Sequence, residues 1–195
     1  QAAQAGCRIV VLPEMFICPY VPALFNSYAE SFPEGETLEW MAKTAAHEKI
    51  AIVGGSIPEH ADNNRIYNTS FIFGEDGKMV AKHRKIHLAD FYGVVPPVLE
   101  SETVAAGDKA TVCDAGGTTI GIAICYDVRF PELSREMALQ GAKMIVFPAA
   151  FGMTTGSVHW ELLMRSRAVD NQVFVVGAAP ARTPGSVRQN WGHSL

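Results

Sequence analysis

Three reactive side chains come directly after apolar segments that have the pattern of strands. Glu14 follows "RIVVLP", Lys85 follows "KMVAKHR", and Cys125 follows "TIGIAI". In α/β folds, catalytic and ligand-binding groups lie at strand ends and in the loops beyond them. If these strand ends meet at one edge, a carboxylate, an ammonium and a thiol lie together. We therefore expect a site for nucleophilic chemistry at that edge.

These three groups fit acyl transfer to water through a thioester. A free thiol has a pKa of about 8.5, so only a few per cent is thiolate at neutral pH. Lys85 and the positive end of a helix expected just after Cys125 favour the thiolate. Glu14 could take the thiol proton and pass it to a departing amine. Lys85 and a backbone N–H beside Cys125 could hold the oxyanion.

A structural explanation stands beside the catalytic one. A cysteine at a strand end is often a small buried hydrophobe, and single charges there are mostly solvated. The nucleophile interpretation of Cys125 therefore depends on the equivalent positions of Glu14 and Lys85. The other cysteines have no comparable setting and are expected to be structural: Cys7, Cys18 and Cys113.

The histidines offer competing chemistry. His83 and His87 are four residues apart, which suits a metal on a helix, but this segment reads as a strand end entering a loop. We expect no metal site there. His159 could in principle pair with Cys125 as in cysteine proteases. It lies in the first turn of an expected helix, where N–H dipoles disfavour an imidazolium, so we expect packing or a hydrogen bond to substrate.

The stretch "TTGS" (154–157) precedes an expected helix start. Small hydroxylic residues and a glycine there expose N–H groups suited to an anion, which makes Thr154 a candidate substrate contact. An N-cap by Thr155 or Ser157 explains the same pattern equally well.

Short apolar runs alternate with amphipathic helical patterns, which indicates an α/β fold. A hairpin around "GEDG" and several βαβ units predict a sandwich of sheets covered by helices. The expected strands are 8–12, 50–57, 67–73, 78–85, 119–124, 143–150 and 172–179. The expected helices are 36–47, 131–140 and 157–171.

Composition narrows the class of protein. The 195 residues suit one domain, and the net charge of −4 is scattered, so nucleic-acid binding is not expected. No apolar run is long enough to predict a membrane segment. Four cysteines without paired spacing favour a reducing, cytoplasmic location. The chain starts without Met, at what reads as a helix end, so we expect residues 1–195 to be one domain truncated at both ends, and a mitochondrial location stays open.

Three motifs taken together resemble the nitrilase superfamily of carbon–nitrogen hydrolases: "LPEMF", "HRKIHL" and "GIAICYDVRFPEL". The resemblance implies an α-β-β-α sandwich that pairs through a helical face into a homodimer and uses no metal or organic cofactor. Further stretches are similar to the ω-amidase branch: "GGSIPE", "YNTSFIFGEDG", "KIHLADF", "TTGSVHWELLMRSRAVDNQVFV" and "NWGHS". That branch hydrolyses the terminal amide of 2-oxoglutaramate and 2-oxosuccinamate and releases ammonia.

The resemblance also implies roles for single residues. Glu14 corresponds to the general base and acid, Lys85 to the oxyanion stabiliser, and Cys125 to the nucleophile. The family has a second active-site glutamate between the lysine and the cysteine. "VLESET" offers Glu100 and Glu102, of which Glu100 fits better, and its implied task is to orient Lys85 and the substrate amide.

Two tyrosines complete the implied site. The N–H of Tyr126 matches a second oxyanion donor, and Tyr20 matches a tyrosine near the substrate pocket. The stretches "FICPYVPALFNSY" and "DFYGVVPPVLES" differ from the branch and leave the choice of amide open. The alternatives are an amidase acting on deaminated glutathione, an N-carbamoyl-amine hydrolase, or a non-catalytic relative of the fold.

Overall fold

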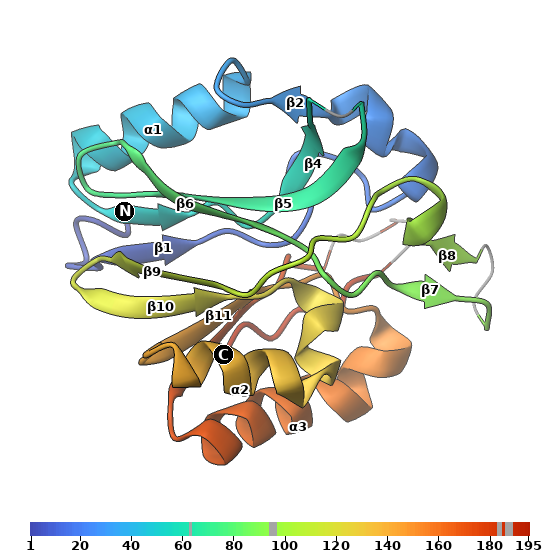
Figure 1. The fold of residues 1–195 in the computed structure, drawn as a ribbon. Coiled ribbons are helices and arrows are strands. Elements are labelled where there is room, and N and C mark those ends of the chain that lie inside the picture. The colour runs from blue at the N-terminus through green and yellow to red at the C-terminus, as the bar shows by residue number, and fades with distance from the viewer. Residues whose placement is uncertain (63, 94–96, 183–184, 186–188) are drawn as a thin grey trace.

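A computed structural model of the chain describes residues 1–62, 64–93, 97–182, 185 and 189–195. Two β-sheets lie face to face, and helices cover the outer face of each (Figure 1). The layers therefore run helix, sheet, sheet, helix, and the predicted α-β-β-α sandwich is confirmed.

The first sheet has six strands in the order β1-β3-β5-β4-β2, with β6 paired to β5. Helix α1 (Glu36–Glu48) covers its outer face by packing Leu38 and Met41 against Phe71 and Phe73. The predicted helix 36–47 and the predicted hairpin are confirmed. The strands are β1 (Ile9–Val11), β2 (Glu30–Ser31), β3 (Ala51–Val53), β4 (Ile57–His60), β5 (Ile66–Phe73) and β6 (Met79–Arg84).

The strand expected at 50–57 is interrupted. Residues 54–56 separate β3 from β4, and these three residues stand opposite only two residues of β5. Gly55 has a φ of +52°, and a Cβ there would collide with the carbonyl oxygen of Pro13. The glycine is therefore required where the chain bends around the segment that carries Glu14.

The second sheet has four strands in the order β12-β11-β10-β9. Strands β10, β11 and β12 are parallel, and the crossover helices α2 and α3 cover the outer face (Figure 1). Strand β9 pairs antiparallel with β10 and was not predicted from the sequence. The elements are β9 (Thr111–Ala115), β10 (Thr118–Ile122), α2 (Pro131–Leu139), β11 (Met144–Pro148), α3 (Met153–Asn171) and β12 (Phe174–Ala178).

The core between the two sheets is aliphatic and buried. Alternation along the strands sends Ile72 of β5 inward to meet Ile120 and Ile122 of β10, while Phe71 and Phe73 face α1. Short elements fill the ends of the sandwich: η1 (Pro22–Tyr28), β7 (Asp90–Phe91), β8 (Val98–Leu99), η2 (Glu100–Glu102) and η3 (Cys125–Arg129).

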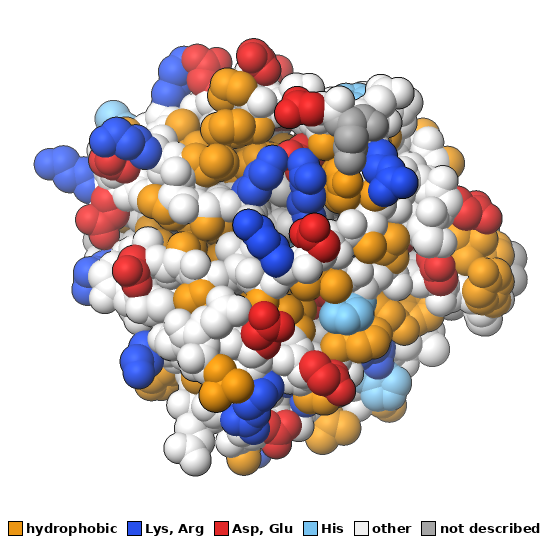
Figure 2. Space-filling view, viewed as in Figure 1, with side chains coloured by type: hydrophobic (Ala, Val, Ile, Leu, Met, Phe, Trp, Pro, Cys, Tyr) orange, Lys and Arg blue, Asp and Glu red, His pale blue; other side chains and the backbone are white. Residues whose placement is uncertain are grey.

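The visible surface carries acidic and basic side chains interspersed with apolar ones (Figure 2). A single-sign field of the kind that binds nucleic acid is not seen on this face. Among the described helices, none is both long enough and apolar enough to cross a lipid bilayer.

Candidate active site

The structure brings the three predicted reactive residues together. Glu14 follows β1 and Lys85 follows β6 in the first sheet, whereas Cys125 follows β10 in the second. All three are buried, with 3%, 0% and 7% of their surface exposed. A carboxylate, an amine and a thiol from distant parts of the sequence therefore share one enclosed site between the two sheets.

Lys85 lies between two carboxylates. Its Nζ is 2.8 Å from Glu14 Oε1 and 2.7 Å from Glu100 Oε2. Burial alone would lower the pKa of Lys85, but the charges of Glu100 and Glu14 raise that pKa well above its usual value. The side chain is therefore held as an ammonium, and Glu100 rather than Glu102 is the second carboxylate beside it.

Neutral donors fix the two carboxylates. The Tyr20 hydroxyl is 2.7 Å from Glu100 Oε1 and 3.3 Å from Glu14 Oε1. The Asn68 amide nitrogen donates to Glu14 Oε1 at 3.0 Å and to Glu100 Oε1 at 3.3 Å. The N–H of Ala89 donates to Glu100 Oε2 at 2.6 Å. Burial, and then the charges of Glu100 and Glu14, raise the pKa of Tyr20 well above its usual value, so the phenol stays a donor.

Asn68 was not identified from the sequence. It lies in the middle of β5, is fully buried, and points to the opposite face from Phe71. The polar run Asn68, Thr69 and Ser70 inside a buried strand was the available signal, because buried polar groups are hydrogen-bonded. The partners of Asn68 could not be read from the sequence, since they come from other elements.

The thiol of Cys125 is held in its neutral form. Burial raises its pKa well above the usual value, Glu14 adds to the rise, and Lys85 and the N–H of Ala150 only partly oppose it. Lys85 favours the thiolate as expected, but burial and the charge of Glu14 outweigh it. The helix after Cys125 is also only the short 3₁₀ helix η3, whose dipole is small, and α2 starts at Pro131.

A base for the thiol is available. One oxygen of Glu14, Oε2, is buried and accepts no hydrogen bond from the described residues, whereas Oε1 is engaged by Lys85 and Asn68. Glu14 and Cys125 interact directly. The arrangement can therefore move the thiol proton to Glu14 as the sulfur attacks.

The backbone at Cys125 is strained. Its φ is +46°, a left-handed conformation that costs a non-glycine residue about 1–2 kcal/mol. The chain turns sharply from β10 into η3 at this residue. Such a turn lifts the thiol out of the strand and presents it to the site, and strain of this kind is typical of functional positions.

A narrow pocket leads to the thiol. Tyr20, Cys125 and Tyr126 line it, together with the apolar side chains of Phe91 in β7 and Val98 in β8. Both tyrosines that the resemblance indicated therefore lie at the pocket. The remaining lining residues are Ala89, Arg129, Ala150, Phe151, Gly152 and Thr155.

Arg129 is the cation of this pocket. Its guanidinium stands 5.3 Å from the rings of both Tyr126 and Phe151, and Nη1 donates to His159 Nδ1 at 3.3 Å. Its Nε is buried without a hydrogen bond, and no described carboxylate forms an ion pair with it. Arg129 follows Cys125 by four residues in the sequence, and the sequence alone does not indicate its role.

Thr154 does not lie at the pocket. Helix α3 begins at Met153 with Gly152 as its N-cap, one turn earlier than expected, so residues 154–157 are helical and do not form a loop before it. Neither Thr155 nor Ser157 is the N-cap. Thr154 is exposed, and its neighbour Thr155 lines the pocket instead.

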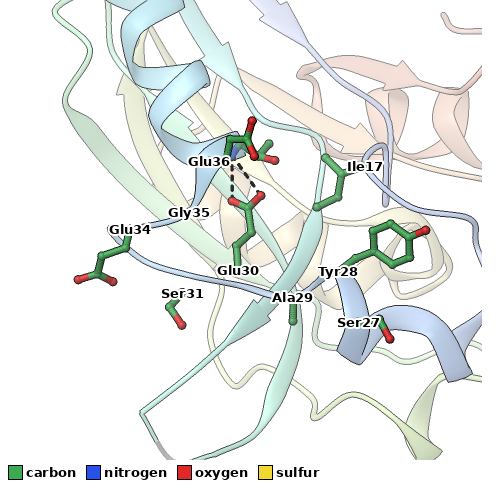
Figure 3. A pocket seen from close by; sticks show the side chains of 10 residues that line it. Ile17, Ser27, Tyr28, Ala29, Glu30, Ser31, Glu34, Gly35 and Glu36 are labelled. Atoms are coloured by element: carbon green, nitrogen blue, oxygen red, sulfur yellow. Dashed lines mark hydrogen bonds between the residues drawn. The ribbon is translucent and has the colours of Figure 1, made fainter.

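A second, wider hollow lies away from this site, at the start of α1 (Figure 3). It has a volume of about 540 Å³ and is lined by Tyr28 and Glu30, among others. Glu30 accepts the N–H groups of Thr37 and Leu38 and so caps the helix. This hollow contains none of the reactive residues.

Comparison with known proteins gives a consistent result. The carbon-nitrogen hydrolase family model matches residues 1–195. The chain is 50% identical to nitrilase homolog 2 of Dictyostelium discoideum, covering 100% of this chain and 60% of that protein. It is 46% identical to human omega-amidase NIT2, covering 100% of this chain and 70% of that protein.

A solved structure agrees with these matches. Saccharomyces cerevisiae Nit3, a member of branch 10 of the nitrilase superfamily, superposes with a TM-score of 0.90 at 44% identity. The superposition covers 98% of this chain and 69% of Nit3. The chain thus spans between 60% and 70% of the length of these relatives.

Proposed function

The chain belongs to the carbon–nitrogen hydrolase family, and from this we propose that it is an amidase working through a thioester on Cys125. The observation that carries the proposal is the buried contact of Lys85 with Glu14 and Glu100 beside the thiol of Cys125. In this assignment Cys125 is the nucleophile, Glu14 the general base and acid, and Lys85 the oxyanion stabiliser.

In the acylation step, the sulfur of Cys125 attacks the amide carbonyl carbon while Glu14 Oε2 takes the thiol proton. The Lys85 ammonium and the N–H of Tyr126 stabilise the oxyanion that forms. The tetrahedral intermediate then collapses, the C–N bond breaks, and the proton held by Glu14 goes to the nitrogen. Ammonia leaves, and the acyl group remains on sulfur.

In the deacylation step, Glu14 takes a proton from a water molecule that attacks the thioester carbonyl. Lys85 stabilises the second oxyanion, the C–S bond breaks, and the proton returns to the sulfur. The acid product leaves. Glu100, fixed by Tyr20 and the N–H of Ala89, keeps the Lys85 amine in place through both steps.

We propose that the substrate is a small amide with a carboxylate at its far end, of the kind hydrolysed by ω-amidases. Relatives named omega-amidase are 44–48% identical over the whole chain, which supports this class. Arg129 supports it independently, because a substrate carboxylate would supply the anionic partner that its guanidinium lacks among the described residues.

The substrate class is tested by comparing 2-oxoglutaramate, 2-oxosuccinamate, deaminated glutathione and N-carbamoyl-β-alanine, with product release as the measurement. We expect the two 2-oxo amides to turn over fastest. Faster turnover of deaminated glutathione or of the carbamoyl compound would overturn the ω-amidase assignment. No turnover of any of the four would favour a non-catalytic relative.

The contribution of Arg129 is tested with Arg129→Met, which keeps an unbranched stem and removes the charged guanidinium. A hydrogen bond to a charged group contributes about 1.5–3 kcal/mol, so kcat/KM for 2-oxoglutaramate should fall about 10–100-fold. Acetamide, which has no carboxylate, should lose much less. Lys43→Met is the control, because Lys43 is exposed on α1, pairs there with Glu39, and lies outside the pocket. Equal losses for both amides would remove Arg129 from substrate recognition.

We also propose a homodimer in a reducing compartment such as the cytoplasm. Val158, Leu162 and Val169 of α3 are exposed and follow one stripe of the helix, which suits a helix-to-helix contact. All four cysteines are free, which fits a reducing location. Light scattering of the wild type and of Leu162→Glu tests the dimer: we expect the substitution to halve the mass, and an unchanged mass would argue against this face.

A further inference from the structure

A buried carboxylate outside the acyl-transfer steps connects the two segments that carry Cys125 and Lys85. Asp127 is fully buried in η3 and is absent from the pocket lining. Its Oδ2 accepts the N–H of Ile124 at 2.8 Å, and its Oδ1 accepts the N–H of His87 at 2.9 Å. Ile124 directly precedes the cysteine, and His87 lies two residues after the lysine. One carboxylate therefore holds the backbone of both reactive segments.

Two histidines surround this carboxylate. The Nδ1 of His87 is 2.8 Å from Asp127 Oδ1, and the His87 ring stacks on Phe130 at 3.6 Å. His83 is buried in β6, with Nδ1 3.1 Å from Thr111 Oγ1 and Nε2 3.5 Å from Asp127 Oδ2. Burial would raise the pKa of Asp127, but His83, His87 and the Ile124 N–H hold it well below its usual range.

The ionisation of Asp127 fixes the donors around it. A carboxylate only accepts hydrogen bonds, so His87 Nδ1 carries a hydrogen. Within the described residues, no three side chains of the His, Cys, Asp or Glu type are placed to hold a metal ion. The cluster connects the two sheets: His83 lies in β6 and His87 follows it, both on the first sheet, whereas Asp127 follows β10 of the second sheet.

Asp127 also closes the strained turn at the nucleophile. The N–H of Asp127 donates to the carbonyl of Ile124 at 3.0 Å, and its carboxylate accepts the N–H of Ile124. Two hydrogen bonds therefore connect the residues on either side of Cys125. Cys125, with its left-handed φ of +46°, lies between these two hydrogen-bonded residues. A turn in a sparsely populated conformation persists only where its surroundings impose it.

We propose that Asp127, supported by His87 and His83, is a positioning residue that sets the separation between the Cys125 sulfur and the Lys85 amine. The inference rests on the proposed acyl transfer, because the separation matters only if Lys85 stabilises an oxyanion formed at Cys125. Reacting groups misplaced by about 1 Å can lose about 100-fold in rate. The two carboxylate oxygens of Asp127 make four polar contacts: with the N–H of Ile124, the N–H of His87, the His87 ring and the His83 ring. An amide in its place can accept hydrogen bonds only at its single oxygen.

The test is acylation by p-nitrophenyl acetate, which reports the first step at the thiol without needing the natural amide. In Asp127→Asn, either the Ile124 N–H or the His87 N–H loses its acceptor. We expect the burst of p-nitrophenolate to keep its amplitude per folded chain and to slow about 100-fold. We expect the KM for 2-oxoglutaramate to stay within about threefold, because the pocket walls are unchanged.

His87 supplies a second pair of variants in case Asp127→Asn folds poorly. His87→Ala removes the ring donor and should slow acylation about 10-fold, since one of the four contacts is lost. His87→Asn places an amide N–H near the position of Nδ1 and should restore the rate to within about threefold. A residue that only stabilises the fold would not show this rescue of rate.

Glu59→Gln is the matched control for losing a buried carboxylate. Glu59 is 2% exposed, and Thr69, Lys82 and Arg84 donate to it. These three donors are all on the first sheet, so Glu59, unlike Asp127, does not connect the Lys85 segment to the Cys125 segment. This variant should melt at a lower temperature yet acylate at the wild-type rate. A wild-type rate in Asp127→Asn, or equal slowing in Glu59→Gln and Asp127→Asn, would overturn the positioning role. Wild-type protein that gives the burst but hydrolyses no 2-oxo amide would overturn the proposed substrate alone.

Discussion

Replacing Lys85 by methionine separates the two tasks that the structure gives this side chain. The amine is fully buried, donates to two carboxylates, and faces the thiol of Cys125. Methionine fills a similar volume without the charge. The variant therefore tests oxyanion stabilisation and charge balance with one substitution.

The expected loss of activity follows from the oxyanion role. Removing one oxyanion donor typically lowers kcat about 100–1000-fold. Lys85→Met should lose at least that much, measured as ammonia released from 2-oxoglutaramate. A rate close to that of the wild type would refute the assignment of Lys85.

The expected loss of stability follows from burial. Breaking a buried ion pair by removing one partner costs about 3–5 kcal/mol, because Glu14 and Glu100 then face each other without a cation. Lys85→Met should therefore unfold at a clearly lower urea concentration at pH 7. Lys85→Met/Glu100→Gln removes one negative charge along with the positive one, so it should regain much of that stability while remaining inactive.

A matched control distinguishes this site from cation loss in general. Lys82 is 2.6 Å from buried Glu59, but Arg84 also pairs with that carboxylate. Lys82→Met should therefore keep the wild-type rate and lose little stability. If the double variant gains nothing over Lys85→Met, charge balance does not explain the cost of the single substitution.

Three further outcomes are expected. Cys125→Ala should abolish turnover and leave the circular dichroism spectrum unchanged, and residual turnover above the detection limit would exclude a sulfur nucleophile. Tyr20→Phe removes the hydroxyl donor 2.7 Å from Glu100. It should lower the free energy of unfolding in urea by about 1–3 kcal/mol and lower kcat about tenfold. Unchanged values would show that Asn68 alone suffices to hold the two carboxylates. Burial raises the pKa of Cys125, so the contribution of the neutral thiol to stability is fully present below the unfolded thiol pKa of about 8.5 and is lost as the pH rises above it. The urea midpoint of the wild type should therefore fall more steeply between pH 7 and 9.5 than that of Cys125→Ala. Parallel curves for the two proteins would contradict the raised pKa.

The sequence predicted the regular elements well where periodicity was strong. The 3.6-residue pattern located α1 to within one residue at its end, and the turn residues located the β5–β6 hairpin. Strand β9 was missed, as were two further features. The bulge at residues 54–56 depends on contact with the Pro13 carbonyl, which is remote in sequence. Helix α3 starts at Met153 because Gly152 is its N-cap, and this glycine makes no side-chain cap that the sequence could signal.

The site was predictable in part for a physical reason. Glu14, Lys85 and Cys125 all lie just after strands, and that rule needs only the order of elements. The sequence could not show that these strand ends belong to two facing sheets and not to the edge of one sheet. The partners of these residues depend on which face of a strand meets which loop. Asn68 and Asp127 act through contacts that span 54 and 40 residues of sequence, and such pairings appear only in three dimensions.

Acyl transfer through Cys125 is tested most directly by peptide mass mapping of protein quenched in acid during steady-state turnover of 2-oxoglutaramate. We expect one acyl group per chain, attached to the peptide that contains Cys125 and absent from Cys125→Ala. Ammonia release with no acylated peptide, or an acyl group on Cys7, Cys18 or Cys113, would show that Cys125 is not the nucleophile.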